Sequence, residues 1–387
     1  MKLETFTYSA HEGWSVESLP ALDSDHTLVV VFGSADWADG HEAFEHLAAA
    51  FPQSHIVGCS TAGEIFGTHL ADSSLSVAAA QFEHGTSVAS AAARVSSQED
   101  SFDAGQALAR QLEQPSLRAV LLFSDGLNVN GSELVRGLNS VLSSHVVVTG
   151  GLAGDGSRFK RTWVVNNGTP QTNLVVAAGL YGDQVFVGHG SKGGWDNFGP
   201  ERRITRSQGN ILFELDGRPA LELYKEYLGE LADGLPATGL LFPLALRSDS
   251  SDEKNLVRTI LAVDEATQSL TFAGDVPQGA LARLMRANFD RLIDGASEAA
   301  ELAGGSDATA TDDEDTLAIA ISCVGRRLVL GQRAEEEIEA TLDVLPRRTR
   351  QIGFYSYGEI APYMHGQCDL HNQTMTLTTI REQAAAA

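Results

Sequence analysis

The sequence is poor in cysteine and has no long apolar run. Its three cysteines, Cys59, Cys323 and Cys368, are too few and too scattered to form a disulfide framework. No apolar stretch approaches the length that a membrane-spanning helix needs, and residues 1–8 lack the apolar core of a signal peptide. These absences favour a cytoplasmic protein with reduced thiols.

Positive charge is also scarce. The 387 residues include 27 Lys and Arg against 51 Asp and Glu, for a formal net charge of -24. A field of this sign repels phosphate backbones and anionic lipids, which argues against nucleic acid and membrane surfaces as partners. A hydrophobic fraction of 43% and a charged fraction of 20% are typical of a globular protein. The length allows about two or three domains with full cores.

A glycine-containing motif occurs in two well-separated parts of the chain. Residues 57–65, the first corner, read VGCSTAGEI, and residues 352–360, the third corner in chain order, read IGFYSYGEI. A weaker copy, the second corner, lies at residues 148–156, where Asp155 aligns with Glu64. Each copy follows an apolar run and precedes alternating residues, so we expect a strand that turns tightly into a hairpin. Glycine permits close approach of backbone or ligand at such a corner. The pairs that align without a gap are Gly58 with Gly353, Gly63 with Gly358, Glu64 with Glu359 and Ile65 with Ile360.

The N-terminal half contains an internal duplication at an offset of 91 residues. In each copy a buried strand is followed by a helix, a second strand, the corner and two alternating strands. A register held over about thirty residues predicts a β-α-β-corner-β-β unit that is used twice. The matching pairs include Val30 with Leu121, Gly40 with Gly131, Glu42 with Glu133, Val57 with Val148 and Gly63 with Gly154.

Periodicity and turn residues predict the other elements. A helix at 219–228 marks the expected boundary between a first domain, 26–220, and a second domain, 221–382, which contains an acidic loop at about 304–315. The predicted fold class is α/β, with helices layered on mixed sheets in both domains. The expected strands are 28–32, 55–57, 75–82, 86–92, 174–181, 184–189, 204–215, 242–246, 256–263, 269–272, 317–324 and 375–380, and the expected helices are 40–51, 102–112, 219–228, 279–303 and 335–345.

Several motifs of the chain resemble those of FIST sensory proteins, over residues 26–382. The motifs are the first corner at 58–65, Gly193-Gly194-Trp195 with Gly199-Pro200, 215–220, 321–326, the third corner at 353–360, and 370–377. The resemblance implies a signal-input protein that binds a small ligand, amino acids being among those proposed for the family. It also implies an alternative, because some members without a fused output domain are haem-binding nitric-oxide sensors that act on a partner histidine kinase.

The first and third corners are the expected ligand site. Their glycines leave backbone amides open to a ligand, and each adds one carboxylate, so we expect the two corners to line one pocket. Glu64 and Glu359 would then share one cationic group or, alternatively, cap two equivalent turns. The candidate ligand-binding residues are Gly58, Cys59, Ser60, Gly63, Glu64, Gly353, Tyr355, Gly358 and Glu359.

A histidine cluster is the candidate for a metal or haem. His365, Cys368 and His371 lie close in sequence, and Cys323 could add a fourth ligand, although ordinary loop and edge residues would show the same spacing. The chain has no Cys-x-x-Cys-His motif, so any haem b would be held without a covalent bond. The axial candidates, in order, are His371, His365 and His189.

Enzymatic function is the less favoured alternative. Ser60 lies in a Gly-x-Ser-x-x-Gly pattern, one residue longer than the nucleophile elbow of hydrolases, and no helix is expected after it. Nothing near Cys59 in the sequence would lower the pKa of its thiol. We therefore expect no catalytic residue, with a small-molecule hydrolase that uses Ser60 or Cys59 as the alternative.

No stretch of the sequence matches a helix-turn-helix, a Walker loop or a basic patch. By analogy with the family, we expect the protein to signal in trans, through a histidine kinase or a cyclic-dinucleotide enzyme.

Overall fold

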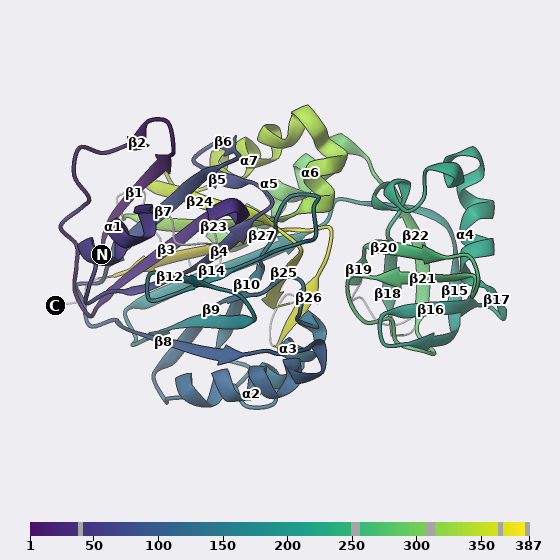
Figure 1. The fold of residues 1–387 in the computed structure, drawn as a ribbon, viewed down its shortest axis with the longest axis horizontal. Coiled ribbons are helices and arrows are strands. Elements are labelled where there is room, and N and C mark those ends of the chain that lie inside the picture. The colour runs from purple at the N-terminus through teal and green to yellow at the C-terminus, as the bar shows by residue number, and fades with distance from the viewer. Residues whose placement is uncertain (38–41, 249–255, 306–313, 363–366, 384–387) are drawn as a thin grey trace.

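Three copies of one strand-helix-strand unit build most of the protein. The computed structural model describes residues 1–37, 42–248, 256–305, 314–362 and 367–383. These residues form a larger body with three mixed sheets and a smaller β-rich body beside it (Figure 1). The prediction of a mixed α/β fold built from repeated units is confirmed.

The three units contain equivalent elements in the same order. The first consists of β3 (Thr27–Ser34), α1 (Glu42–Ala50), β4 (His55–Thr61), β5 (Glu64–Phe66), β6 (His69–Ala71), β7 (Ser74–Gln81) and β8 (Ser87–Arg94). The second consists of β9 (Leu117–Ser124), α3 (Gly131–Asn139), β10 (Val147–Leu152), β11 (Val164–Asn166), β12 (Thr169–Gln171), β13 (Leu174–Tyr181) and β14 (Val185–Lys192). The third consists of β23 (Thr316–Cys323), α6 (Val324–Leu330), α7 (Ala334–Asp343), β24 (Thr349–Ser356), β25 (Gly358–Pro362), β26 (Cys368–His371) and β27 (Met375–Glu382).

The centre of each sheet is a parallel strand pair, joined by a helical crossover. The pairs are β3 with β4, β9 with β10, and β23 with β24. All eight residues of β3 are buried, and all eight of β23 are too. Near-continuous apolar sequence is expected where both faces of a strand are covered, which explains why these runs were readable as strands.

Each corner sends its hairpin to the sheet of a different unit. The first corner places β5 beside β24, the second places β11 beside β4, and the third places β25 beside β10. The three sheets are therefore completed in a cycle. Because every sheet borrows strands from another unit, the units depend on one another for their backbone hydrogen bonds.

The last strand of each unit is shared in the same way. β8 pairs with β13, and β14 pairs with β27. The equivalent position beside β7 is filled by β1 (Lys2–Ser9) from the start of the chain, an element that the sequence did not predict.

Helices cover the sheets of the larger body. α2 (Ser101–Leu112) packs against α3 and against β8 and β13. α5 (Phe289–Gly305) packs against α7, β14 and β27. Within the part of the chain that the structure describes, no helix combines the length and apolarity needed to cross a bilayer.

The smaller body is inserted between the second and third units, and its core includes Leu212, Leu221, Phe272 and Leu284. The predicted domain boundary at residue 220 falls at the first residue of α4, inside this body, and stays a prediction. Its elements are β15 (Asp196–Gln208), β16 (Ile211–Leu215), β17 (Arg218–Pro219), α4 (Ala220–Leu228), β18 (Leu244–Arg247), β19 (Leu256–Arg258), β20 (Ile260–Asp264), β21 (Ser269–Phe272) and β22 (Leu281–Arg286).

Some predicted elements were wrong. The single strand expected at 204–215 is β15 and β16, separated by a turn at Gly209, where φ is 55°. The helix expected at 279–303 is β22 followed by α5. In β22 the buried Ala282 and Leu284 alternate with half-buried neighbours, because one face of this strand packs on the core of the smaller body. The acidic loop predicted at 304–315 lies mainly outside the described residues.

A glycine in the second parallel strand of each unit permits close approach of the first strand. A Cβ added to Gly58 would lie 1.8 Å from the carbonyl oxygen of Val31, and one added to Gly353 would lie 1.9 Å from that of Ala320. Gly150 has the same relation to Leu122, at 1.8 Å. No side chain fits at these distances, so glycine is required for strand packing at all three corners.

The substitution Gly353→Ala should destabilise the protein by about 3 kcal/mol or more, because backbone atoms on both sides must move. Gly331→Ala is the matched control, since its Cβ would meet no atom within 4 Å and only its φ of 57° opposes the change. That strain costs about 1–2 kcal/mol. Urea unfolding measures both, and equal losses of stability would contradict the role assigned to Gly353.

Candidate functional site

The three corners meet one another through their backbones. The amide of Ala62 donates to the carbonyl of Tyr355 at 2.8 Å, and the amide of Tyr355 donates to the carbonyl of Gly63 at 2.9 Å. The first and third corners therefore lie side by side. The amide of Tyr357 donates to the carbonyl of Leu152 at 3.1 Å, which joins the third corner to the second. The amide of Gly154 donates to the carbonyl of Ser60 at 3.0 Å, which joins the second corner to the first.

Glu64 makes a closed set of hydrogen bonds at its own corner. Its carboxylate accepts from the hydroxyl of Thr61, from the amide of Ser74 at 3.0 Å and from the hydroxyl of Ser74 at 2.9 Å. These bonds tie the corner to the first residue of β7, on the far side of the hairpin.

Glu359 repeats this arrangement at the third corner. It accepts from the hydroxyl of Ser356 at 2.7 Å, from the amide of Thr374 at 3.1 Å and from the hydroxyl of Thr374 at 2.9 Å. Burial raises the pKa of both Glu64 and Glu359 to about 7, against the hydrogen bonds that favour their ionised forms. The geometry corresponds to two equivalent caps rather than to one shared cation site.

The nine predicted ligand-binding residues are all buried. Ser60 Oγ accepts from the amide of Trp163 at 3.1 Å, and the hydroxyl of Tyr355 donates to Glu337 at 2.7 Å. Burial raises the pKa of the Cys59 thiol. None of the nine lines either of the two cavities described below, so their contact with a ligand stays a prediction.

The two described histidine candidates lie within sheets. His371 is on β26, opposite Glu359, with Nε2 3.0 Å from the carbonyl oxygen of Ala361. His189 is on β14, opposite Thr378. His365 lies outside the described residues. No group of three or more His, Cys, Asp or Glu side chains in the described ranges is arranged to hold a metal ion. Neither described histidine lines a cavity below, so this geometry does not fit a haem there.

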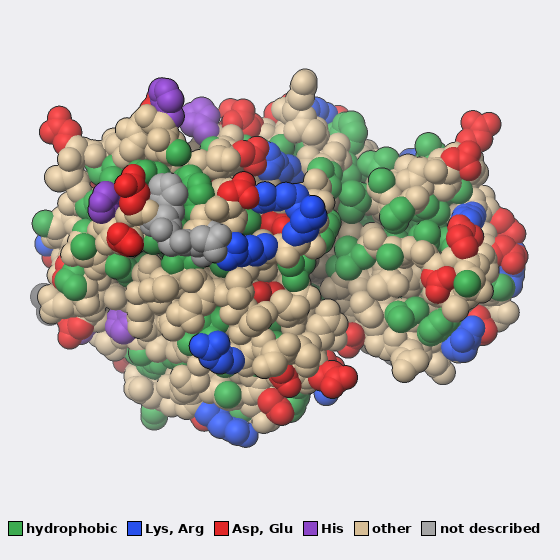
Figure 2. All heavy atoms as spheres, viewed as in Figure 1, with side chains coloured by type: hydrophobic (Ala, Val, Ile, Leu, Met, Phe, Trp, Pro, Cys, Tyr) green, Lys and Arg blue, Asp and Glu red, His purple; other side chains and the backbone are tan. Residues whose placement is uncertain are grey.

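A cavity of about 490 Å³ lies between the two bodies, and we call it the apolar cavity. Hydrophobic side chains gather along this junction in Figure 2. From the larger body the wall comes mainly from the segments that follow β9, β10, β23 and β24. Ligands of α/β proteins bind outside the carboxyl ends of parallel strands, where chain connections diverge. The lining residues of the larger body include Gly126, Leu127, Val129, Asn130, Leu152, Phe159, Cys323, Val324, Leu328 and Tyr357, and those of the smaller body include Asn210, Leu235, Pro236, Ala237, Leu240, Thr259, Leu261, Phe272 and Ala273.

An aromatic pair at the second and third corners forms part of this wall. Phe159 stacks on Tyr357, with ring centroids 4.5 Å apart and an interplanar angle of 15°. The hydroxyl of Tyr357 donates to Asp155. Asp155 also accepts from the amides of Phe159 and Lys160 at 2.8 Å each. The carboxylate that the sequence pattern aligned with Glu64 therefore holds the loop that presents Phe159.

A second cavity, of about 680 Å³, lies between α3 and the smaller body, and we call it the polar cavity. Arg258, Asp275 and Asp369 contribute to its lining. Arg258 is buried and donates to the carbonyls of Leu370 at 2.9 Å and Asp275 at 3.1 Å. Burial lowers its pKa to about 10, against the opposing effect of Asp369 and Asp275. Thr259, the next residue, lines the apolar cavity, so neighbouring residues of this chain segment contribute to the two cavities.

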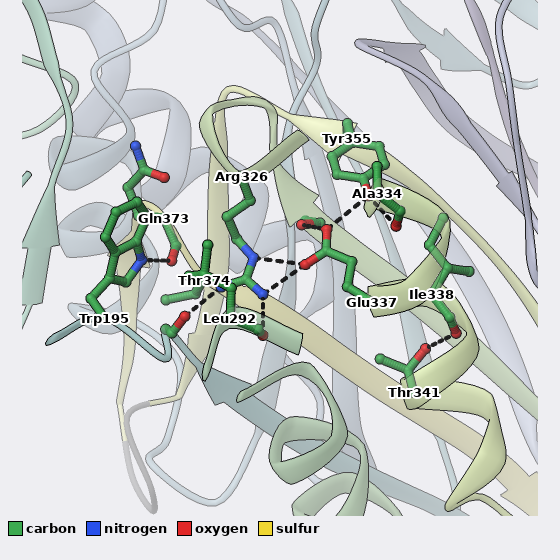
Figure 3. Close-up of polar contacts among 12 residues, drawn as sticks. Trp195, Leu292, Arg326, Ala334, Glu337, Ile338, Thr341, Tyr355, Gln373 and Thr374 are labelled. Carbon is green, nitrogen blue, oxygen red and sulfur yellow. Dashed lines mark hydrogen bonds and ion pairs between the residues drawn. The ribbon is translucent and has the colours of Figure 1, made fainter. Parts of the chain in front are cut away.

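A buried ion pair holds both connections between the bodies (Figure 3). The guanidinium of Arg326, on α6, pairs with Glu337 on α7 at 2.7 Å, and both side chains are fully buried. The same guanidinium donates to the carbonyl of Gly193, where the chain leaves the larger body. It also donates to the carbonyl of Leu292 at 2.7 Å, where the chain has returned in α5.

The residues beside Gly193 strengthen this anchor. The indole N–H of Trp195 donates to the carbonyl of Gln373 at 2.8 Å. A Cβ on Gly194 would lie 2.0 Å from the carbonyl oxygen of Arg291, so glycine is needed where the outgoing chain crosses α5. The Gly-Gly-Trp motif thus fixes the connection to the smaller body.

Sequence reasoning missed the apolar cavity. Neither Tyr357 nor Phe159, which lies in a loop of basic residues, is among the site residues predicted from the sequence. An aromatic residue in a charged loop directly after a corner was a usable signal. The contribution of the smaller body, such as Leu235 and Pro236, had no recognisable pattern.

Comparisons with known proteins agree with the resemblance read from the motifs. The model of the FIST N domain matches residues 27–218, and the model of the FIST C domain matches residues 220–362. No protein of curated function matches the chain. One similar solved structure is a cyanuric acid hydrolase from A. caulinodans, 12% identical, which covers 77% of this chain and 100% of its own. Its TM-score of 0.18 is too low to support an argument about fold or function.

The two buried glutamates should make stability depend on pH. A folded-state pKa near 7 means that the native carboxyls bind protons which the unfolded chain has released. Stability from this source is complete at low pH and is lost as pH rises through 7, by up to about 3 kcal/mol for each carboxyl. Burial lowers the pKa of His55, which acts in the opposite direction below neutral pH, so single variants must be compared with wild type.

We expect Glu359→Gln to remove about half of this loss between pH 5.5 and pH 8, because the amide keeps an acceptor for Thr374 and carries no charge. Glu17→Gln, at an exposed position, is the control for the change in charge. The measurement is urea unfolding across the pH range. A difference between Glu359→Gln and wild type that does not vary with pH would refute this explanation.

Proposed function

Because this chain belongs to the FIST family, whose domains sense small ligands in signal transduction, we propose that it is a sensory input protein whose ligand binds in the apolar cavity between the two bodies. The observation that carries the proposal is the position of this cavity. Its wall is contributed by both bodies, so a ligand there contacts both and can favour one relative position over another.

The Arg326 anchor offers a route from the cavity to the rest of the protein. Cys323, Val324 and Gly325 line the cavity and directly precede Arg326 in the chain. A shift at the start of α6 therefore acts on the guanidinium that holds Gly193 and Leu292. In this proposal the smaller body has two placements relative to the larger body. Contacts with the ligand and contacts with Arg326 both affect the balance between these placements.

The receiver of the signal is also part of the proposal. We infer that the protein acts in trans on a histidine kinase or a cyclic-dinucleotide enzyme, in the cytoplasm. The family's place in signal transduction supports a signalling partner, and three free, buried cysteines fit a reducing compartment. We do not extend the proposal to haem or nitric oxide, because neither described histidine candidate lines the apolar or the polar cavity.

A hydrolase remains the less supported alternative. Ser60 and Cys59 are both fully buried, and the hydroxyl of Ser60 accepts a hydrogen bond from the backbone amide of Trp163. A nucleophile needs access to its substrate and a base within hydrogen-bonding distance. Neither residue has the required access.

Ala237→Trp tests the site without removing a hydrogen bond of the structure. Ala237 is exposed on the 3-10 helix Ala237–Leu241 and lines the apolar cavity, so an indole there should exclude the ligand. Protein purified from its native cells would be denatured, and the released small molecules identified by mass spectrometry. We expect a compound that is near-stoichiometric with wild type and reduced by at least about tenfold with Ala237→Trp.

Ala266→Trp is the control, because Ala266 is exposed on the same body outside both cavities. It should release as much compound as wild type. The same set of small molecules from all three proteins would show that the apolar cavity is not the sensing site.

The anchor can be tested with the double variant Arg326→Met/Glu337→Gln. Arg326→Ala alone should cost about 3–5 kcal/mol, because it leaves Glu337 buried without its partner. The double variant carries no buried charge and should recover most of that stability. The side-chain amide oxygen of the introduced glutamine can still accept hydrogen bonds from Ser322 and Tyr355. In the wild-type protein these hydroxyls donate to Glu337 at 2.9 and 2.7 Å.

Hydrogen exchange should nevertheless rise in the double variant around residues 193–197 and 288–294, which lose the contacts of the guanidinium. Exchange in β3, remote from the anchor, provides the internal control. Unchanged exchange at both connections would mean that Arg326 stabilises the core without anchoring the smaller body.

A further inference from the structure

We propose that the apolar cavity takes an uncharged, flat and largely apolar molecule with few hydrogen-bonding groups. This inference rests on the proposed function, since it assigns a chemical class to the ligand of the same cavity.

The lining of the cavity, within the described residues, contains no Asp, Glu, Lys, Arg or His side chain. Its two titratable residues, Cys323 and Tyr357, have pKa values that burial raises, so both are neutral at physiological pH. An ion that enters such a site loses hydration without gaining a counter-ion. An amino acid would have to leave two charges unpaired.

Arg158, a basic residue of the corner loop, is already engaged. Arg158, next to Phe159, pairs with Asp36 and donates to the carbonyl of Asp155 at 2.8 Å. It is therefore held by the larger body rather than by the cavity. The charged alternative is the polar cavity, where Arg258 and two aspartates offer partners for a zwitterion.

The shape of the wall favours a flat molecule. Phe159 is 49% exposed although it is a large apolar residue, and its φ of 51° is a conformation that few non-glycine residues adopt. Asp155 fixes this backbone through the amides of Phe159 and Lys160. The protein thus holds a ring with one face on Tyr357, at a position where a second aromatic molecule can continue the stack.

Two more exposed apolar residues lie around the same cavity. Leu261, on β20, is 44% exposed, and Leu328, on α6, is 50% exposed. Together with Phe159 they come from three separate parts of the chain. Exposed apolar side chains that converge on one cavity are typical of a binding surface rather than of isolated surface residues.

The polar side chains of the wall are all neutral. They belong to Gln98, Asn130, Ser157, Asn210 and Thr259. The buried hydroxyl of Thr259 has no hydrogen-bond partner among the described residues. Neutral groups of this kind can pair with a few hydrogen-bonding groups of a ligand, but they provide no counter-ion for a charge.

The test uses two fluorescent probes that differ by one charge. N-phenyl-1-naphthylamine is neutral, and 8-anilinonaphthalene-1-sulfonate has the same ring framework with a sulfonate. We expect saturable, one-to-one binding of the neutral probe to the full-length protein and binding of the sulfonate that is at least about tenfold weaker. Phe159→Ala should weaken the affinity for the neutral probe by about tenfold.

Phe289→Ala is the matched control, because Phe289 is also exposed, at 43%, and does not line the cavity. Leu328→Ser is a second variant, on the opposite element of the wall, and should weaken the neutral probe as well. Both target side chains are about half exposed, so their loss should not unfold the protein, which circular dichroism would verify. Equal affinity for the two probes, or neutral-probe binding that is insensitive to both variants, would overturn the inference.

A parallel thermal-shift titration with a mixture of the protein amino acids separates this inference from the proposed function. If the mixture stabilises wild type but not Ala237→Trp, the sensing site is correct and the ligand class is wrong. If Ala237→Trp changes neither the binding of the probes nor the amount of any compound released from protein of native cells, the proposed function fails together with the inference.

Discussion

The exchange of hairpins between units is the constraint on which the rest of the structure depends. Each corner leaves its own parallel strand pair and completes a different sheet. Glycines such as Gly58 and Gly353 allow the two strands of the parallel pair to approach each other closely just before the corner. Since the sheets are completed in a cycle, no unit can satisfy its backbone hydrogen bonds alone. The larger body is therefore expected to fold as one cooperative unit.

Buried polar groups then perform two different tasks in this framework. Glu64 and Glu359 tie their own corners to the following strands, which explains two buried carboxylates that line neither cavity. Arg326 instead joins parts of the chain that are distant in sequence, at the connections to the smaller body. The first task is local and structural, whereas the second fixes the two chain connections between the bodies.

The apolar cavity results from the point at which the smaller body is inserted into the chain. The smaller body is inserted between the second and third units, and it lies against the ends of strands from both. A ligand bound there, as we propose, would contact segments after β9 and β23 as well as the inserted body. Its binding free energy could then favour one placement of the smaller body.

The sequence alone determined the repeated unit, its strands and helices, and the three corners, because apolar periodicity and glycine spacing are local properties of the chain. It also allowed the two readings of Glu64 and Glu359, as cation ligands or as caps. The tertiary structure decided that each caps its own hairpin, which strand each hairpin joins, and that Phe159, Tyr357 and Thr259 share one cavity. Strand pairing uses backbone groups that nearly every residue has, so the sequence does not show which strand a hairpin joins. The cavity forms only when segments far apart in the chain pack together, so no local sequence pattern predicts it.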